Sequence, residues 1–268
     1  MSKILEYSSR ILKCPICGGD LRLRHNMLKC IKCGRNYPIK NGIIDLLPRG
    51  LVFGNDCKWM EFYDRSALSY FILFHKIIPM FTLGTEGRVR RRWVELLQIG
   101  KGDVVLDVAT GTGKNIPYLV EKVGAEGLVF GVDISMNMLR YAAKMYGKLG
   151  NVILIRANAS YLPFRDECFD AVIHVGGINT FEEKELAIRE MFRVVKRNAK
   201  VVIVDEGLDP KLRRSILGKL LLKINALYAS APPLKELKEL TSSIHVEWGL
   251  IPSKVIPIWP YYLIIAKK

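Results

Sequence analysis

From residue 100 onward the chain repeats one pattern, in which a short apolar run is followed by a turn and an amphipathic segment. The apolar runs predict strands at 104–109, 128–134, 152–159, 169–177 and 200–207, with helices between them at 114–123, 136–147 and 182–196. Two later runs, 243–250 and 261–268, have no helix between them. Because strands that alternate with helices pair in parallel, the pattern predicts an α/β fold with a doubly wound, mostly parallel seven-stranded sheet and an antiparallel hairpin at one edge.

Two apolar segments outside these strands are candidates for covering a pocket. Residues 70–83 include charged or helix-breaking positions, and residues 212–230 predict a basic amphipathic helix. Each is interpreted either as a helix that packs on the sheet or as part of a lid over an apolar site. No apolar stretch approaches the ~20 residues that a membrane-spanning helix needs. With Glu6 interrupting any signal-peptide core, we expect a cytoplasmic protein without a transmembrane segment.

The N-terminal region carries four of the six cysteines in two C-x-x-C pairs, Cys14 with Cys17 and Cys30 with Cys33. Two such pairs on tight turns, joined by a short hairpin, are typical of a tetrahedral zinc site. Two disulfides or a redox pair are the alternatives, and a cytoplasmic setting disfavours both. His25 lies between the pairs and is expected to be a solvated hairpin residue, because four thiolates already complete the site.

The cysteine region also resembles a known module. The segments "CPICGGDL" and "LKCIKCGRNYPIKNGIIDLLP" are similar to the zinc-ribbon family typified by the small activator subunit of several tRNA and translation-factor methyltransferases. The similarity covers about residues 10–48. We therefore expect three parts: a zinc ribbon at 1–50, a helical linker and lid segment at 51–99, and a larger α/β domain at 100–268.

A glycine-rich turn, "VATGTGKN", follows the first predicted strand. A phosphate-binding P-loop would need glycine at Val108 and a hydroxyl residue at Asn115, and a dinucleotide fingerprint would need glycine at Ile116. Both common interpretations of such a turn fail. The turn is instead expected to let the backbone approach a small ligand without phosphates.

Polar residues end three consecutive strands at what should be one edge of the sheet, where ligands of such folds bind. Asp107 ends the first strand and is expected, with the next two strand ends, to present a group to one adenosine-bearing ligand. Asp133 ends the second and is placed to accept both hydroxyls of a ribose, with Ile134 against an adenine ring. Asn158 and the Ala159 amide follow the third and are suited to the edge of that ring.

Residues 56–208 resemble the class I S-adenosylmethionine-dependent methyltransferases, in particular the ubiquinone/menaquinone-biosynthesis-like branch, through "EFYDRSA", "VLDVATGTG", "VFGVDIS", "LPFRDECFDAVIHVGG" and "IREMFRVVKRNAKVVIVDE". The resemblance implies a Rossmann-like fold with S-adenosylmethionine as cofactor, its methionine end held by the glycine turn. Ala109 departs from the usual first glycine, Asn158 from the usual Asp, and "KRNAK" from the usual Lys-Pro-Gly-Gly turn. The expected cofactor-binding residues are Tyr63, Asp107, Ala109, Gly111, Gly113, Asp133, Ile134, Asn158, Ala159 and His174.

Candidates for the acceptor side are fewer. By the resemblance, Tyr63 lies near the sulfonium, where its ring face would stabilise positive charge, its hydroxyl would meet the cofactor's carboxylate, or it would only pack. His174 is interpreted either as a general base or as part of the pocket wall. Asn179 and Phe181 are expected to line the acceptor pocket. His75 and His245 have no functional neighbours in the sequence.

The net charge is +15, and the excess lies at the two ends of the chain: residues 1–50 carry ten Lys and Arg against three Asp and Glu. Three functions fit these observations. The first is a methyltransferase acting on a small or lipid-like acceptor, with peripheral membrane contact left open. The second is an rRNA or tRNA methyltransferase whose basic ribbon docks on RNA. The third is a partner protein that binds the cofactor without catalysing a reaction.

Overall fold

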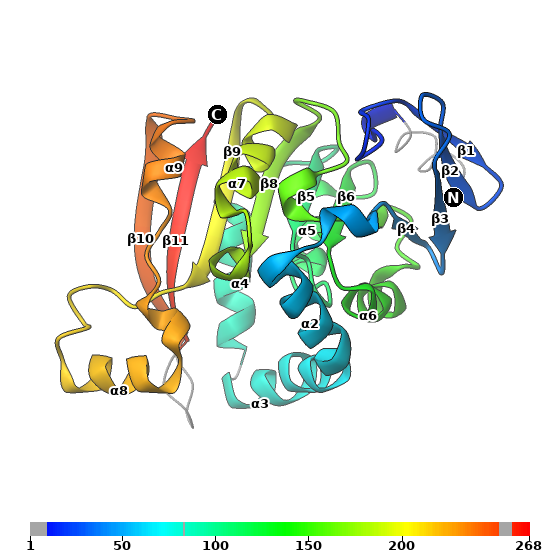
Figure 1. Cartoon of the computed structure of the whole chain (residues 1–268). Coiled ribbons are helices and arrows are strands. Elements are labelled where there is room, and N and C mark those ends of the chain that lie inside the picture. The colour runs from blue at the N-terminus through cyan, green and yellow to red at the C-terminus, as the bar shows by residue number, and fades with distance from the viewer. Residues whose placement is uncertain (1–9, 83, 252–258) are drawn as a thin grey trace.

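The computed structural model describes residues 10–82, 84–251 and 259–268, so positions 1–9 of the predicted ribbon and Leu83 of the predicted lid lie outside the described residues. Within the described parts, eleven strands form one continuous sheet in the order β1-β2-β3-β4-β7-β6-β5-β8-β9-β11-β10 (Figure 1). The strands are β1 (Leu21–Arg24), β2 (Met27–Cys30), β3 (Asn36–Lys40), β4 (Ile43–Asp45), β5 (Val104–Val108), β6 (Leu128–Asp133), β7 (Val152–Arg156), β8 (Phe169–Val175), β9 (Val195–Glu206), β10 (Ser243–Ile251) and β11 (Trp259–Lys267).

The seven predicted strands are all present as neighbours in this sheet. Strands β7, β6, β5, β8 and β9 pair in parallel, β11 joins β9 antiparallel, and β10 completes the predicted hairpin at that edge. All five residues of β5 are buried, as expected for a central parallel strand covered on both faces. The doubly wound architecture and the terminal hairpin are therefore confirmed.

Helices cover both faces of the sheet. They are α2 (Gly54–Ile72), α3 (Ile78–Thr82), α4 (Thr85–Glu95), α5 (Ile116–Val123), α6 (Met136–Tyr146), α7 (Lys184–Val194), α8 (Ile216–Ile224) and α9 (Leu234–Lys238), with a π-helical turn, η2 (Leu73–Ile77), joining α2 to α3. Leu106 packs with α7 on one face, while Val105 packs with α4, α5 and α6 on the other. The predicted helix at 212–230 is shorter, because it ends at Ile224 and a 3₁₀ turn follows.

The cysteine-containing strands are fused to the edge of the main sheet. β4 pairs in parallel with β7, and Leu12 forms an isolated bridge with Phe164. Leu21 and Leu28 belong to the same hydrophobic cluster as Phe164 and the helices of that face. The ribbon therefore shares its core with the α/β fold, which accounts for how so short a segment buries apolar side chains.

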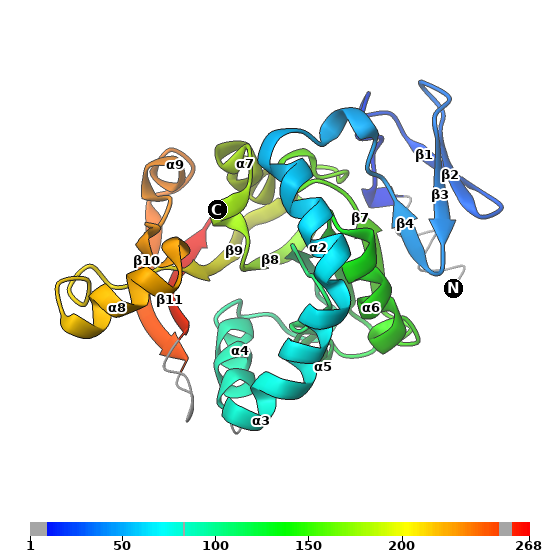
Figure 2. The ribbon, with the colours of Figure 1, turned by 60° about the horizontal axis from the view of Figure 1, so that its bottom comes forward.

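The carboxyl ends of the parallel strands mark one end of the molecule. Figures 1 and 2 show α2, α3 and α8 at this end, with α8 beside the β10–β11 edge and apart from α2 and α3, and with the ribbon at the opposite sheet edge. In the described part of the chain, no single helix is long and apolar enough to cross a membrane; only the sharply bent pair Gly54–Thr82 and Thr85–Glu95 meets that length and composition together.

Candidate functional site

A cavity lies at the carboxyl ends of the parallel strands, beneath α2. It brings together many residues that the sequence singled out, from three strand ends, together with several that it did not. The predicted residues that line the cavity are Tyr63, Ala109, Gly111, Asp133, Ile134, Asn158, Ala159 and Phe181. Asp107, Gly113, His174 and Asn179 are not among the lining residues.

Asp133 ties the second strand to the glycine turn. One carboxylate oxygen accepts the backbone N–H of Gly111 at 2.8 Å, and the other accepts that of Ser135 at 2.8 Å. Burial raises the pKa of Asp133 to about 6. Since a carboxylate has about four lone-pair sites, Asp133 retains acceptor capacity for a ligand hydroxyl.

The glycine turn itself is shaped by Asp107. The buried Asp107 carboxylate accepts hydrogen bonds from the Thr110 hydroxyl at 2.6 Å and the Asn115 amide at 3.1 Å. Gly113 adopts φ 83°, and a Cβ there would lie 2.8 Å from Cδ1 of Ile116. Both residues therefore build the turn from behind rather than facing the cavity.

Two cations beside the turn were missed by the sequence reasoning. Arg90 donates to Glu86 at 2.7 Å and to Asn115 at 2.8 Å, and Lys114 donates to Glu86 at 2.5 Å. Burial opposes ionisation of Glu86, but Arg90 and Lys114 outweigh it and lower the pKa of this carboxyl. Arg90 and Lys114 line the cavity and Glu86 does not, so the cavity wall is cationic at this point. This cationic wall could not be predicted from the sequence, because it forms where α4 packs against the glycine turn.

Asn158, which follows β7, forms a hydrogen-bonded pair with Asp56 that the sequence did not predict. The side-chain amide of Asn158 donates to Asp56 at 2.7 Å and to the Leu51 carbonyl at 2.9 Å, while its oxygen accepts the Ser160 N–H at 2.9 Å. Asp56 also lines the cavity. Asparagine at 158 thus fits a neighbour that the usual aspartate would repel, and Asp56 is a further acceptor that the sequence did not suggest.

Aromatic side chains from α2 and η2 form the roof of the cavity. Tyr63 is joined there by Trp59, Tyr70 and Phe74. The helix is held over the strands by Asp64, whose carboxylate accepts the Ser135 hydroxyl at 2.6 Å and the Asn137 N–H at 2.9 Å at the start of α6. A carboxylate is favoured at a helix N-terminus, so Asp64 fixes the position of Tyr63.

His75 also connects this roof to the turn. Its Nε2 lies 2.8 Å from the Thr112 hydroxyl, and burial together with Lys114 lowers the pKa of His75 to about 4. The imidazole is therefore neutral near pH 7. Local sequence patterns could not single out His75, because its partner Thr112 is 37 positions away.

His174 is fully buried at the end of β8. Its Nδ1 donates to the Val108 carbonyl, 3.0 Å away, and its Nε2 accepts the backbone N–H of Ile178 at 3.0 Å. Burial lowers the pKa of His174, so the ring is neutral with both nitrogens engaged. This geometry leaves no nitrogen free for an acceptor and favours the structural interpretation over a general base.

Asn179 is likewise engaged behind the cavity. Its backbone N–H donates to Asp205 at 2.9 Å, its side-chain amide donates to the Glu206 carbonyl at 2.9 Å, and its side-chain oxygen accepts from Tyr262. Glu206 itself lines the cavity. Burial and the neighbouring Asp205 raise the pKa of Glu206 to about 9, which makes it a neutral carboxylic acid near pH 7.

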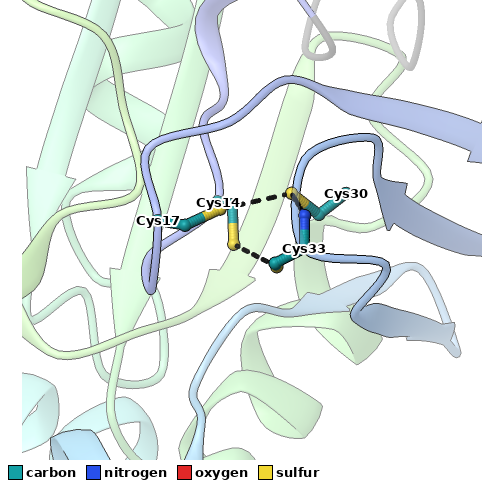
Figure 3. A group of neighbouring side chains, drawn as sticks. All are labelled: Cys14, Cys17, Cys30 and Cys33. Carbon is teal, nitrogen blue, oxygen red and sulfur yellow. Dashed lines mark hydrogen bonds between the residues drawn. The ribbon is translucent and has the colours of Figure 1, made fainter.

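The four ribbon cysteines converge (Figure 3). Their sulfurs all lie within 4.8 Å of one another, with Cys14 and Cys33 3.8 Å apart and Cys17 and Cys30 3.5 Å apart. Zinc–sulfur bonds of about 2.3 Å place the sulfurs of a tetrahedral site about 3.8 Å apart. All four are free cysteines, and their spacing fits a shared zinc ion.

The fold is that of the class I S-adenosylmethionine methyltransferases. Residues 106–203 match the family model described as a methyltransferase domain, and residues 9–42 match the model described as Trm112p-like protein. The chain is 38% identical over 120 residues to the ubiquinone/menaquinone biosynthesis C-methyltransferase UbiE of Xylella fastidiosa strain M12, covering 44% of this chain and 47% of that protein. For UbiE of Teredinibacter turnerae the identity is 32% over 157 residues, covering 55% and 62%. The chain thus spans about half the length of these curated relatives.

Solved structures share the fold at low identity. A chain from the complex of the Haloferax volcanii Trm112 methyltransferase activator with a methyltransferase aligns with TM-score 0.56 and 16% identity, covering 76% of this chain and 96% of that one. The YcgJ protein of Bacillus subtilis aligns with TM-score 0.53 and 15% identity, covering 68% and 98%. At these identities, the two likenesses support the fold alone.

Proposed function

We propose that the protein transfers the methyl group of S-adenosylmethionine to a small, apolar or lipid-like acceptor. The observation that carries this proposal is the position of Asp133 and the glycine turn on the wall of a cavity whose roof is aromatic. The first feature suits an adenosine-bearing ligand without phosphates, and the second suits an uncharged acceptor.

The chain offers a partner for each part of the cofactor. Asp133 would accept the ribose hydroxyls, and Ile134 would lie against the adenine. The adenine amine would meet Asn158 Oδ1 or Asp56, with the Ala159 amide toward a ring nitrogen. Arg90 and Lys114 supply the positive charge that a carboxylate beside Gly111 would need.

The bound cofactor would supply an activated methyl group on a sulfonium, so the protein's work is to position the acceptor and exclude water. Tyr63, whose pKa is raised by burial, would present a neutral ring to the positive charge. Phe181 and the α2 aromatics would enclose the acceptor. Glu206, neutral at pH 7, would accept a hydrogen bond from an acceptor hydroxyl, or accept its proton once ionised.

In the ribbon, Cys14, Cys17, Cys30 and Cys33 would hold one structural zinc ion, with all four positions taken by protein and none left open for chemistry. The ribbon would then stabilise the sheet edge through β4. This role rests on the sulfur spacing and on the core that the ribbon shares with β7.

The test is incubation of the zinc-loaded protein and a cell extract with S-adenosylmethionine labelled in its methyl group. Label in the organic-soluble fraction is expected, and Asp133→Ala should abolish it while Glu126→Gln, an exposed acid, should not. Label confined to RNA would replace this proposal with RNA methylation, for which the basic ribbon would be the docking site. Calorimetric binding of the cofactor without label in any fraction would favour the non-catalytic partner.

A further inference from the structure

Helix α8 carries an apolar surface that the fold does not cover. Of its nine residues only Gly218 and Leu221 are buried, while Ile216 is 90% exposed, Leu220 54% and Ile224 61%. A helix that merely covered a sheet would bury this row, since exposed apolar side chains gathered on one helix mark an interaction site.

A second exposed apolar group lies on the segment from α2 to α3. Met80 is 72% exposed and Leu68 is 57% exposed, and they are joined by others along the same run. The further exposed members are Ile72, Leu73, Ile77 and Phe81. This segment and α8 lie at the same end of the molecule, the end to which the parallel strands run (Figures 1 and 2). We call residues 68–81 and 212–224 together the apolar face.

The charges within the two segments have one sign, and Asp209, which accepts the Lys211 N–H at 2.8 Å, is the acid that borders the second segment. Residues 68–82 and 211–229 contain no Asp or Glu. They contain six cations: Lys76, Lys211, Arg213, Arg214, Lys219 and Lys223. All of these except Arg213 are exposed. The combination of large aliphatic side chains with lysines and arginines is typical of helices that lie in the headgroup region of a bilayer.

We infer that the apolar face docks on the surface of an anionic lipid bilayer. The aliphatic side chains would enter the acyl boundary, and the flexible lysines would reach the phosphates. A second copy of the chain fits less well, because two such faces would oppose cations with cations. RNA would satisfy the cations but would leave Ile216 and Met80 exposed.

The position of the face beside the cavity adds to this inference. Phe74 lies within the first segment, and Leu227 follows the second by three positions; both line the cavity. A bound bilayer would therefore lie next to the cavity, and an apolar acceptor could pass from the bilayer into the cavity. Docking itself requires no methyl transfer, so it goes beyond the proposed function and can be tested without it.

The experiment is co-sedimentation of the full-length, zinc-loaded protein with vesicles of pure phosphatidylcholine or of phosphatidylcholine with 30% phosphatidylglycerol, a composition chosen to give about the surface charge of a natural anionic membrane. We expect binding to the anionic vesicles, weakened by NaCl. The double variant Ile216→Asp/Leu220→Asp should weaken it at least about tenfold. Met145→Asp, which alters an exposed methionine of α6 outside the face, should leave it unchanged.

Charge reversal separates the lipid from the alternatives. Lys219→Glu/Lys223→Glu should abolish the preference for anionic vesicles while circular dichroism and the thermal midpoint stay those of the parent. Absence of vesicle binding by the parent at low salt would overturn the inference. So would a parent dimer, seen by light scattering, that Ile216→Asp converts to monomer without any vesicle binding. Vesicle binding without methyl transfer would contradict the proposed function but not the docking on a bilayer.

Discussion

The Asn158 side-chain amide donates a 2.7 Å hydrogen bond to the Asp56 carboxylate, across 102 positions of the chain. This bond joins the start of α2 to the end of β7. Asp56 also accepts the Glu182 N–H at 3.0 Å, so one buried carboxylate joins three segments at this side of the cavity. An amide rather than a carboxylate at position 158 is what allows the arrangement.

Replacing Asn158 by Asp would place two carboxylates in contact at this point. We expect the free energy of unfolding at pH 7 to fall by about 1–3 kcal/mol, because a buried polar pair loses its hydrogen bond and gains repulsion. Chemical denaturation at pH 7 measures this loss. Adding Asp56→Asn should recover part of the stability at pH 7; no recovery would contradict the pairing.

The backbone of the glycine turn predicts a large loss of stability at one small residue and little change at another. Gly113→Ala should cost about 2–3 kcal/mol, because φ 83° is unfavourable for alanine and its Cβ would lie 2.8 Å from Ile116. Ala109 already adopts φ 56°, so Ala109→Gly relieves strain while adding chain entropy and should change stability by less than about 1 kcal/mol. Thermal unfolding of the two variants compares them directly, and equal losses would refute the difference.

Buried acids in the cavity predict a pH-dependent stability. Burial raises the pKa of Asp133 to about 6, and burial with Asp205 raises that of Glu206 from an ordinary 4.5 to about 9. The folded chain therefore holds more protons than the unfolded one at intermediate pH, so the ligand-free protein should lose stability as pH rises. For Glu206 this loss lies between about pH 4.5 and 9, at a slope of at most about 1.4 kcal/mol per pH unit.

Unfolding curves measured from pH 6 to pH 9 test this dependence. Glu206→Gln should flatten the decline, whereas Glu126→Gln should follow the parent because Glu126 is exposed. A decline that is the same in all three proteins would show that Glu206 is ionised in the folded state.

His174 predicts a structural defect without a catalytic signature. His174→Gln should lower the free energy of unfolding by about 1–3 kcal/mol, because at least one buried backbone group loses its partner. The pH profile of methyl transfer, measured below the variant's melting temperature, should keep the shape of the parent's. If the variant's pH profile lacks an ionisation step that the parent's profile shows, His174 is instead the general base.

Zinc removal should affect more than the ribbon. Because Leu21 and Leu28 share a core with Phe164, chelation or Cys33→Ser should lower the melting temperature of the whole chain rather than release an independent module. Metal analysis of the parent should give one zinc per chain. A main unfolding transition unchanged by chelation would show that the ribbon does not support the sheet.

The sequence by itself determined the elements whose patterns are local. Alternating apolar runs and helices specified the parallel sheet, the C-x-x-C spacing specified the four-thiol cluster, and strand-end positions placed Asp133 beside the glycine turn. These features depend on periodicity and on short spacings, which neighbouring residues carry. Only the tertiary structure brought Arg90 and Asp56 to the cavity, engaged both nitrogens of His174, and joined β4 to β7. Those contacts link residues far apart in the chain, and their partners follow from how helices and sheet edges pack rather than from any local pattern.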